Sequence, residues 1–275
     1  MAKPMPPRTS LPAAQHLVVR YAKRGKMRFA SHRDVARAFE RGVRRAGLPI
    51  AYSAGFSPHP KISYVGGAPT GVASEAEYLT LALTSQEAVD QVRVRLDAML
   101  PDGIDVVDVT EAGLGGPPEA SVWQVALPGV RLDVATRAVA GFLAMTEAPV
   151  ERLTDKGVRR MDARSAVREM AVLDPSDELA AADDAQAFRR VAVTNKDGCA
   201  ILRMIVLHMA PAVRPEDVLS ALSAEQGLVP SSPPLTIRLA QLWPGQGRPE
   251  AEEGWPEACQ PEQGSRGLLT GKTAS

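Results

Sequence analysis

A Gly- and Pro-rich segment, AGLGGPPEA at residues 112–120, divides the chain into two stretches in which strand-like and helix-like patterns alternate. Glycine and proline at this density interrupt both kinds of regular structure, so we predict a linker here. Each stretch has about 100 residues, enough to bury a hydrophobic core. We therefore predict two folded halves, 15–111 and 121–243, between disordered tails at 1–14 and 244–275, which are rich in proline, glycine or glutamate.

The first half follows the order strand, helix, strand, helix, strand. Two apolar-alternating runs around Lys-Arg-Gly in HLVVRYAKRGKMRFAS predict a hairpin at 16–31. Ser31 then begins a helix with Asp34 three residues on, and Gly47 ends it. The remaining expected elements are a strand at 76–83, a helix at 86–99 and a strand at 104–109. This order is typical of a ferredoxin-like or RRM-like α+β sandwich.

The second half repeats the theme loosely, so we predict two such α+β halves in tandem. A hairpin is expected to turn at Asp197-Gly198, between FRRVAVTN and CAILRMIVLHM. The other expected elements are strands at 121–127 and 148–153, alternating segments at 158–173, helices at 131–144 and 214–225, and a strand at 235–243.

The formal net charge is zero, yet charges of one sign gather in separate parts of the chain. Residues 16–61 contain eleven basic and two acidic residues, whereas residues 62–120 contain two basic and ten acidic ones. This asymmetry indicates a basic surface that meets a polyanion. Mutual compensation between the two regions across one folded domain is the alternative.

The basic residues of the expected helix at 32–46 fall on one face. At 100° per residue, the apolar positions, from Val35 to Ala46, occupy a sector of about 100°, and four arginines lie opposite. Their planar guanidinium groups bind phosphate oxygens bidentately, so this stripe predicts a nucleic-acid-binding face. We expect other basic residues to extend it. The predicted contacts are Arg33, Arg37, Arg41 and Arg44, extended by Lys23, Arg24, Lys26, Arg28 and Lys61.

A second candidate site is the loop AYSAGFSPHPKIS. Pro58 and Pro60 restrict the backbone on both sides of His59, which suits a presented functional side chain. A Pro-rich surface loop with no ligand is the plainer interpretation. The candidate residues of this site are Ser53, Phe56, Ser57 and His59, with Glu75 and Glu77 from the following strand.

Catalytic alternatives centre on His32 and His59. With Glu75 and Glu77, the two imidazoles are the ligand types of a zinc or iron centre, but no HExxH or HxH spacing supports one. The same histidines could cleave RNA by general acid–base catalysis. His32 also falls on the packing side of its helix, where a hydrogen-bonded core histidine is the plainer interpretation. No Walker loop, GxGxxG, GxSxG or radical SAM cysteine triplet is present, so we expect no metal or cofactor.

The chain also has features of a cytoplasmic protein. No apolar run approaches the roughly 20 residues that cross a bilayer, and the Pro-rich start lacks the apolar core of a secretory signal. Cys199 and Cys259 supply neither a disulfide framework nor a CxxC metal site. We expect a cytoplasmic location without membrane contact.

Three long strings carry a family resemblance: RYAKRGKMRFASHRD at 20–34, ERGVRRAGLPIAYSAGFSPHPKIS at 40–63 and GVASEAEYLTL at 71–81. They resemble the signature of the radical-SAM-linked proteins, a bacterial domain family of unknown function. The resemblance is strong over 16–110 and diffuse to about 243. Members occur fused behind B12-binding radical SAM enzymes or as separate proteins, often encoded beside a ribonuclease of the E/G type.

The resemblance implies a partner role, because this chain lacks the enzymatic domain. The leading hypothesis is a non-catalytic RNA-binding protein that presents tRNA or rRNA to a radical SAM modification enzyme or an RNA-processing complex. A metal-independent endoribonuclease using His32 or His59 is one alternative, since tandem ferredoxin-like folds with such a histidine resemble CRISPR-type RNA endoribonucleases. A protein-interaction scaffold with a basic docking face is the other.

Overall fold

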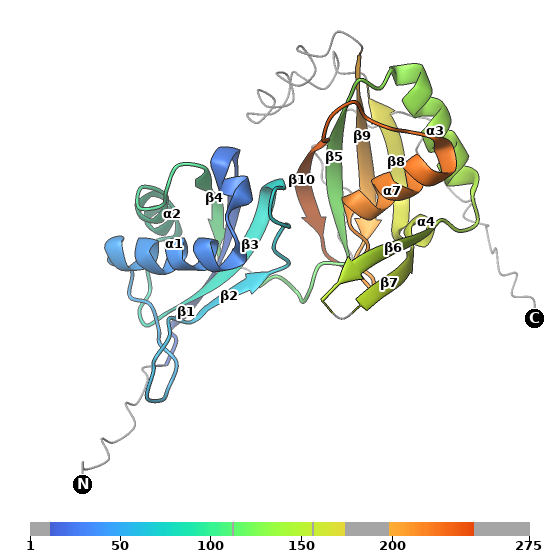
Figure 1. Cartoon of the computed structure of the whole chain (residues 1–275). Coiled ribbons are helices and arrows are strands. Elements are labelled where there is room, and N and C mark those ends of the chain that lie inside the picture. The colour runs from blue at the N-terminus through green and yellow to red at the C-terminus, as the bar shows by residue number, and fades with distance from the viewer. Residues whose placement is uncertain (1–11, 112, 156, 174–197, 245–275) are drawn as a thin grey trace, which may run out of the picture.

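The computed structural model describes residues 12–111, 113–155, 157–173 and 198–244, which form an α+β fold on one eight-stranded sheet (Figure 1). The strand order is β4-β1-β3-β10-β5-β9-β8, and β2 pairs with β3 beside this path. The predicted α+β class is confirmed. Most of the predicted tails at 1–14 and 244–275, and the first arm of the hairpin predicted around Asp197-Gly198, lie outside the described residues.

The first half has a ferredoxin-like βαββαβ topology. Its strands lie in the order β4-β1-β3-β2, all antiparallel, with one helix after β1 and one after β3. The sequence pattern does not predict β2, a four-residue strand within a Gly- and Pro-rich segment. The elements are β1 (Gln15–Lys23), α1 (His32–Arg45), β2 (Ile62–Val65), β3 (Ala73–Leu83), α2 (Val89–Asp97) and β4 (Ile104–Thr110).

The second half has the same topology with one insertion. Its strand order β10-β5-β9-β8, again antiparallel, matches β4-β1-β3-β2 position by position. The insertion, between α3 and β8, is the hairpin β6–β7 followed by the short helix α4. The elements are β5 (Ala120–Pro128), α3 (Leu132–Ala144), β6 (Pro149–Thr154), β7 (Gly157–Asp162), α4 (Ala163–Ala166), β8 (Val167–Leu173), β9 (Cys199–Leu207), α7 (Pro215–Gln226) and β10 (Leu235–Leu242).

The hairpin predicted at 16–31 is wrong in its second arm. After β1, the chain turns at Gly25, which has φ +52°, and forms a 3-10 helix, η1 (Gly25–Phe29). The reason is topological: β1 pairs with β3 on one edge and with β4 on the other, so no edge remains for a neighbouring hairpin arm. Alternation of apolar residues indicates which side chains of a strand are buried, but it does not indicate which strands pair with its two edges.

Helix α1 follows the predicted local signals closely. The Ser31 hydroxyl accepts from the Asp34 backbone N–H while the Asp34 carboxylate accepts from the Ser31 N–H, which completes the capping box. At the other end Gly47 adopts φ +61°, a left-handed conformation that glycine reaches without strain. The helix therefore begins and ends where its sequence directs.

Each half has its own core where its helices meet the sheet (Figure 1). In the first half, Phe39 of α1 packs edge-to-face on Tyr21 of β1, with ring centroids 4.7 Å apart. In the second half, Phe142 of α3 lies among Trp123, Met204 and other buried residues. Within the described residues, no helix combines the length and the apolar character needed to cross a membrane.

The halves join where β10 pairs with the start of β3. This pairing is parallel and short, with Ile237 opposite Ala73 and Arg238 opposite Ser74. Charged side chains are buried at the joint, because the guanidinium of Arg238 donates to the carboxylate of Glu77, and both side chains are only 3% exposed. A buried ion pair thus lies between the two apolar cores.

Candidate nucleic-acid interface

The outer face of α1 carries the predicted arginine stripe. Val35, Ala38, Phe39 and Val43 turn toward the core of the first half and are buried. Among the residues that the structure describes, no carboxylate lies within 4 Å of any guanidinium of the stripe. The four exposed side chains of the stripe are Arg33, Arg37, Arg41 and Arg44.

The acids of α1 leave this stripe positive. Asp34 is engaged at the helix start, where hydrogen bonds from the Ser31 hydroxyl and backbone, followed by the Arg37 charge, hold the pKa of its carboxyl below the ordinary value. Glu40 is exposed and makes no ion pair with any residue in the described ranges. The helix face therefore carries several guanidinium groups whose charge is balanced chiefly by solvent ions.

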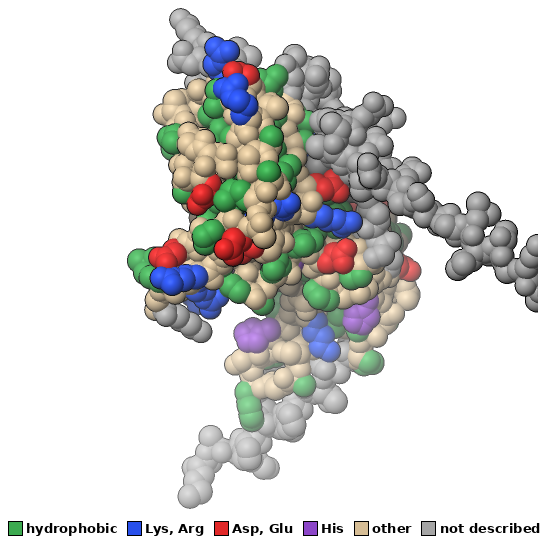
Figure 2. Space-filling model, turned by 90° about the vertical axis from the view of Figure 1, so that its right-hand side faces the viewer, with side chains coloured by type: hydrophobic (Ala, Val, Ile, Leu, Met, Phe, Trp, Pro, Cys, Tyr) green, Lys and Arg blue, Asp and Glu red, His purple; other side chains and the backbone are tan. Residues whose placement is uncertain are grey.

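The side of the molecule that carries α3 and α7 differs in its charge pattern. Figure 2 shows basic and acidic side chains close to one another there, rather than a surface of one sign. Arg137 pairs with Asp133 at 3.2 Å, and Arg160 pairs with Glu151 at 2.7 Å. Mixed signs are what a solvated surface ordinarily shows, so this side contrasts with the single-sign stripe of α1.

The residues expected to extend the stripe divide into two groups. Lys26 and Lys61 are exposed and remain available. Arg28 is half-buried, with its guanidinium carbon 4.6 Å from the centroid of the Phe29 ring. Arg24 binds Glu75 bidentately and contacts Asp105 at 3.1 Å, so its charge is compensated within the molecule.

Lys23 does not lie on this surface. Its side chain is only 3% exposed, and its Nζ donates to the carbonyl oxygens of Ala68 (3.2 Å) and Pro69 (3.3 Å). Sequence position placed it at a hairpin turn, but β1 continues through Lys23 and its side chain turns inward. Lys23 is therefore not part of the exposed basic surface on which its contact with a nucleic-acid backbone was predicted.

The loop before β2 exposes Phe56, Ser57 and His59, whereas Glu75 and Glu77, predicted for the same site, are bound by Arg24 and Arg238. A bridge between Tyr52 and Pro60 closes its base, and the Ser53 hydroxyl accepts from the His59 backbone N–H at 3.0 Å. Phe56 is 88% exposed, and Ser57 and His59 are exposed beside it. The loop is thus a closed projection with an apolar tip.

Of the residues proposed for a shared catalytic or metal site, His32 and Glu77 line one cavity, whereas Glu75 is bound by Arg24. The His32 ring packs edge-to-face on Tyr64 in β2, with centroids 5.1 Å apart, whereas His59 precedes that strand. The extended span from Lys61 to Tyr64 alone measures about 10 Å. No group of three or more His, Cys, Asp and Glu side chains suited to a metal ion occurs in the described part of the chain.

A cavity of about 170 Å³ lies at the N-terminal end of α1. His32 and Gly67, both exposed, stand at its rim, and buried polar side chains reach it from the sheet. Sequence reasoning placed Glu77 in the loop site, but its carboxylate faces this cavity and is bound by Arg238, 161 residues away in the chain. The lining residues are Tyr21, Lys23, Ala30, His32, Val35, Gly67, Ala68 and Glu77.

The one available signal for this cavity is a charged residue inside an apolar strand. Glu77 stands in ASEAEYLTLAL, where a buried carboxylate requires a partner. The pattern indicates that Glu77 has a buried partner. It does not identify Arg238 as that partner, because the two residues are far apart in the sequence.

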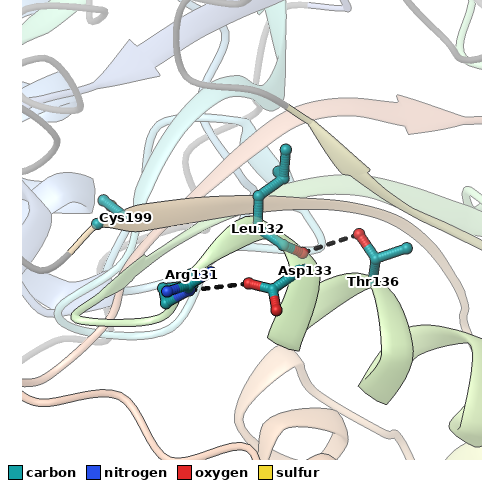
Figure 3. A pocket seen from close by; sticks show the side chains of 6 residues that line it. Arg131, Leu132, Asp133, Thr136 and Cys199 are labelled. Carbon is teal, nitrogen blue, oxygen red and sulfur yellow. Dashed lines mark hydrogen bonds and ion pairs between the residues drawn. The ribbon is translucent and has the colours of Figure 1, made fainter.

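A larger open pocket of about 720 Å³ lies beside α3, but its polar groups are already paired (Figure 3). Arg131 contacts Asp133 at 3.0 Å, and the Thr136 hydroxyl donates to the Leu132 carbonyl at 2.8 Å. Burial raises the pKa of the Cys199 thiol above its ordinary value, which disfavours the reactive thiolate. We therefore place the candidate site on α1 and not here.

Comparison with known families identifies a conserved bacterial domain and carries no link to radical SAM proteins. A family model described as "Uncharacterized protein conserved in bacteria (DUF2344)" matches residues 16–215. The chain belongs to this family. No curated protein matches it.

The DUF2344 match contains the whole stripe and every residue that lines the cavity at α1. It ends at Pro215, the first residue of α7, and so leaves out β10 and Arg238. The strand that joins the two halves therefore lies beyond the matched segment.

Proposed function

We propose that this protein binds RNA through the stripe on α1 and presents it, without catalysing a reaction itself, to a modification or processing enzyme. One observation carries the proposal: four arginines at helical spacing share one exposed face without a carboxylate partner in the described residues. Guanidinium groups three or four residues apart recur about every 5–6 Å along the axis. That interval is close to the spacing of phosphates along an RNA strand.

The identity of the enzyme is inferred from sequence. Strings such as YSAGFSPHP resemble radical-SAM-linked proteins, which favours a radical SAM enzyme or a ribonuclease E/G-type complex as partner and tRNA or rRNA as cargo. The endoribonuclease alternative would need His32 and His59 on one phosphodiester, and their separation along β2 does not favour it. Cytoplasmic location belongs to the same proposal.

The test is charge reversal on the stripe. The Arg37→Glu/Arg41→Glu variant should lose most of its affinity for a single-stranded RNA at moderate salt, measured by fluorescence anisotropy. Each phosphate contact that is lost means that fewer counterions are released on binding. The magnitude of the slope of log affinity against log salt should therefore decrease by about 1.4 for the two contacts. Circular dichroism should show an unchanged fold, because both side chains are exposed.

The matched control reverses two arginines elsewhere. Arg137→Glu/Arg160→Glu makes the same change in net charge on α3 and β7, where both arginines are exposed and paired with acids. Its affinity for RNA should stay within about twofold of the parent, as expected for surface changes remote from the contact. Equal losses in the two variants, or no loss in the first, would contradict the proposal. Capture of a protein partner that survives nuclease treatment and requires Arg37 would instead assign the stripe to protein docking.

A further inference from the structure

The cavity at the N-terminal end of α1 contains a buried positive charge that lacks a counter-ion. The Nζ of Lys23 is bonded only to two carbonyl oxygens, and among the described residues no carboxylate lies within 4 Å of it. Burial lowers the pKa of this ammonium group, and the more distant Glu77 charge opposes that effect only partly. Because a lysine ammonium has three N–H donors, one donor remains for a ligand.

Glu77 does not neutralise Lys23, because its carboxylate is engaged elsewhere. One oxygen accepts from the Arg238 guanidinium, and the other accepts from the Ala68 backbone N–H at 3.0 Å. The Glu77–Arg238 pair is thus neutral by itself. Together with Arg238, which lies behind the cavity wall, Lys23 and Glu77 carry one net positive charge, although the Glu77 carboxylate itself faces the cavity.

A second buried donor lines the same cavity. Tyr21 is 4% exposed, and its hydroxyl makes no hydrogen bond to any other residue of the described chain. Burial raises the pKa of this phenol far above its ordinary value, so the hydroxyl stays protonated and able to donate. This hydroxyl is not one of the fully buried atoms that lack a partner, so it has surface open to the cavity, where a ligand or water can accept its hydrogen bond.

Helix α1 contributes the N-terminal end of its dipole, which the Asp34 carboxylate in the first turn offsets in part. His32 is its first residue and stands at the rim of the cavity, so the N-terminal end of the helix dipole lies beside the same space. The volume of 170 Å³ corresponds to about five or six water molecules at about 30 Å³ each. This is room for one tetrahedral oxyanion.

We propose that this cavity binds a phosphoryl group, either as free orthophosphate or as the terminal phosphate monoester of a larger molecule, held by Lys23, Tyr21 and the N-terminal end of α1. The ligand would supply the negative charge that Lys23 lacks and the acceptor that Tyr21 lacks. This proposal does not depend on RNA binding by the stripe, which lies on the opposite face of α1.

Gly67 keeps the cavity open. A Cβ built on Gly67 would lie 3.8 Å from the Glu77 carboxylate and 3.9 Å from His32 Nδ1, in ordinary contact, and its backbone is not left-handed. A larger side chain at this rim position therefore fills the space without straining the fold. Gly67→Val is accordingly a steric plug that removes no charge.

The experiment is calorimetric titration of the full chain with orthophosphate, with chloride at equal ionic strength as the reference. Saturable binding to phosphate but not to chloride is expected. Tyr21→Phe should weaken it about tenfold, as for loss of one charge-assisted hydrogen bond. The phenyl ring keeps the packing on Phe39. Lys23→Met and Gly67→Val should abolish binding; should Lys23→Met fail to fold, Tyr21→Phe and Gly67→Val decide the question.

Tyr64→Phe is the matched control. It deletes a hydroxyl that is fully buried without a partner, but Tyr64 does not line the cavity, so affinity for phosphate should not change. Arg37→Glu/Arg41→Glu should also bind orthophosphate normally, which separates failure of this proposal from failure of the RNA proposal. An oligoribonucleotide with a 5′-phosphate, compared with its 5′-hydroxyl form, distinguishes the two sources of the group.

Preference for the phosphorylated oligonucleotide, lost in Tyr21→Phe, would assign the cavity to terminal phosphates. Equal affinity for both oligonucleotides with saturable orthophosphate binding would assign it to the free anion. No saturable orthophosphate binding together with equal affinity for the two oligonucleotides would overturn the proposal, as would binding that Tyr21→Phe and Gly67→Val leave unchanged.

Discussion

At the scale of single residues, Gly103 shows how closely the backbone constrains its neighbours. It precedes β4 with φ +87°, and a Cβ there would lie 2.7 Å from the Arg24 carbonyl oxygen, which is a backbone atom. The Gly103 carbonyl in turn accepts from the Arg24 N–H at 2.8 Å. This contact fixes the chain as it leaves β1.

Gly103→Ala should therefore destabilise the protein by more than the roughly 1–3 kcal/mol of left-handed strain, because a backbone clash adds to it. Gly71→Ala is the control: Gly71 has φ +93°, but nothing lies within 4 Å of its added Cβ. Urea unfolding of both variants measures the difference in unfolding free energy. Equal losses in the two variants would show that the backbone shifts to relieve the clash at no cost.

The residues of the two candidate sites differ in how far sequence reveals them. The stripe of Arg33 to Arg44 is predictable, since helical periodicity and the Ser31 capping box are local. Burial of Lys23 is not predictable, because it depends on where residues 68 and 69 cross over the end of β1. The same is true of Glu77, whose partner Arg238 comes from the last strand.

At the scale of elements, α1 depends on its cap to hold the stripe in register. Ser31→Ala should cost about 1 kcal/mol of unfolding free energy at neutral pH, because it removes the acceptor for the Asp34 N–H and one hydrogen bond to the Asp34 carboxylate. Ser220→Ala in α7 is the matched control. That hydroxyl bonds the Glu216 carbonyl within the helix, and alanine should be neutral or slightly stabilising.

The cap should also depend on pH. Because hydrogen bonds from Ser31 lower the pKa of Asp34 in the folded state, its contribution is fully present above the ordinary pKa of about 3.9. It is lost as the pH falls through the lowered folded value. The cost of Ser31→Ala should accordingly shrink between pH 7 and pH 3 in urea unfolding; a cost independent of pH would show that the carboxylate takes no part.

Element types proved easier to predict than pairing. Strands such as 104–109 and helices such as 131–144 follow from periodicity, and the structure places β4 and α3 there. The false hairpin arm at 25–29 and the unforeseen strand β2 both involve edges of the sheet. Which strand pairs with a given edge depends on segments that are distant in the sequence, so a local pattern does not predict it.

At the scale of the whole molecule, the Glu77–Arg238 pair lies at the joint between the halves. Glu77→Ala leaves a buried guanidinium without its carboxylate, and removal of one partner of such a pair costs about 3–5 kcal/mol. Urea unfolding measures the loss. Glu77→Leu/Arg238→Met, which removes both charges, should recover most of it, whereas a double variant as unstable as Glu77→Ala would show that lost packing and not the unpaired charge is responsible.

The parallel pairing of β10 with β3 has a consequence for the nascent chain during its synthesis. The carboxylate of Glu77 leaves the ribosome 161 residues before the guanidinium that neutralises it. At about 5–20 residues per second, that interval lasts about 8–32 s. During this time the Glu77 carboxylate of the nascent first half has no guanidinium partner. The ion pair at the joint can therefore form only after β10 has been synthesised.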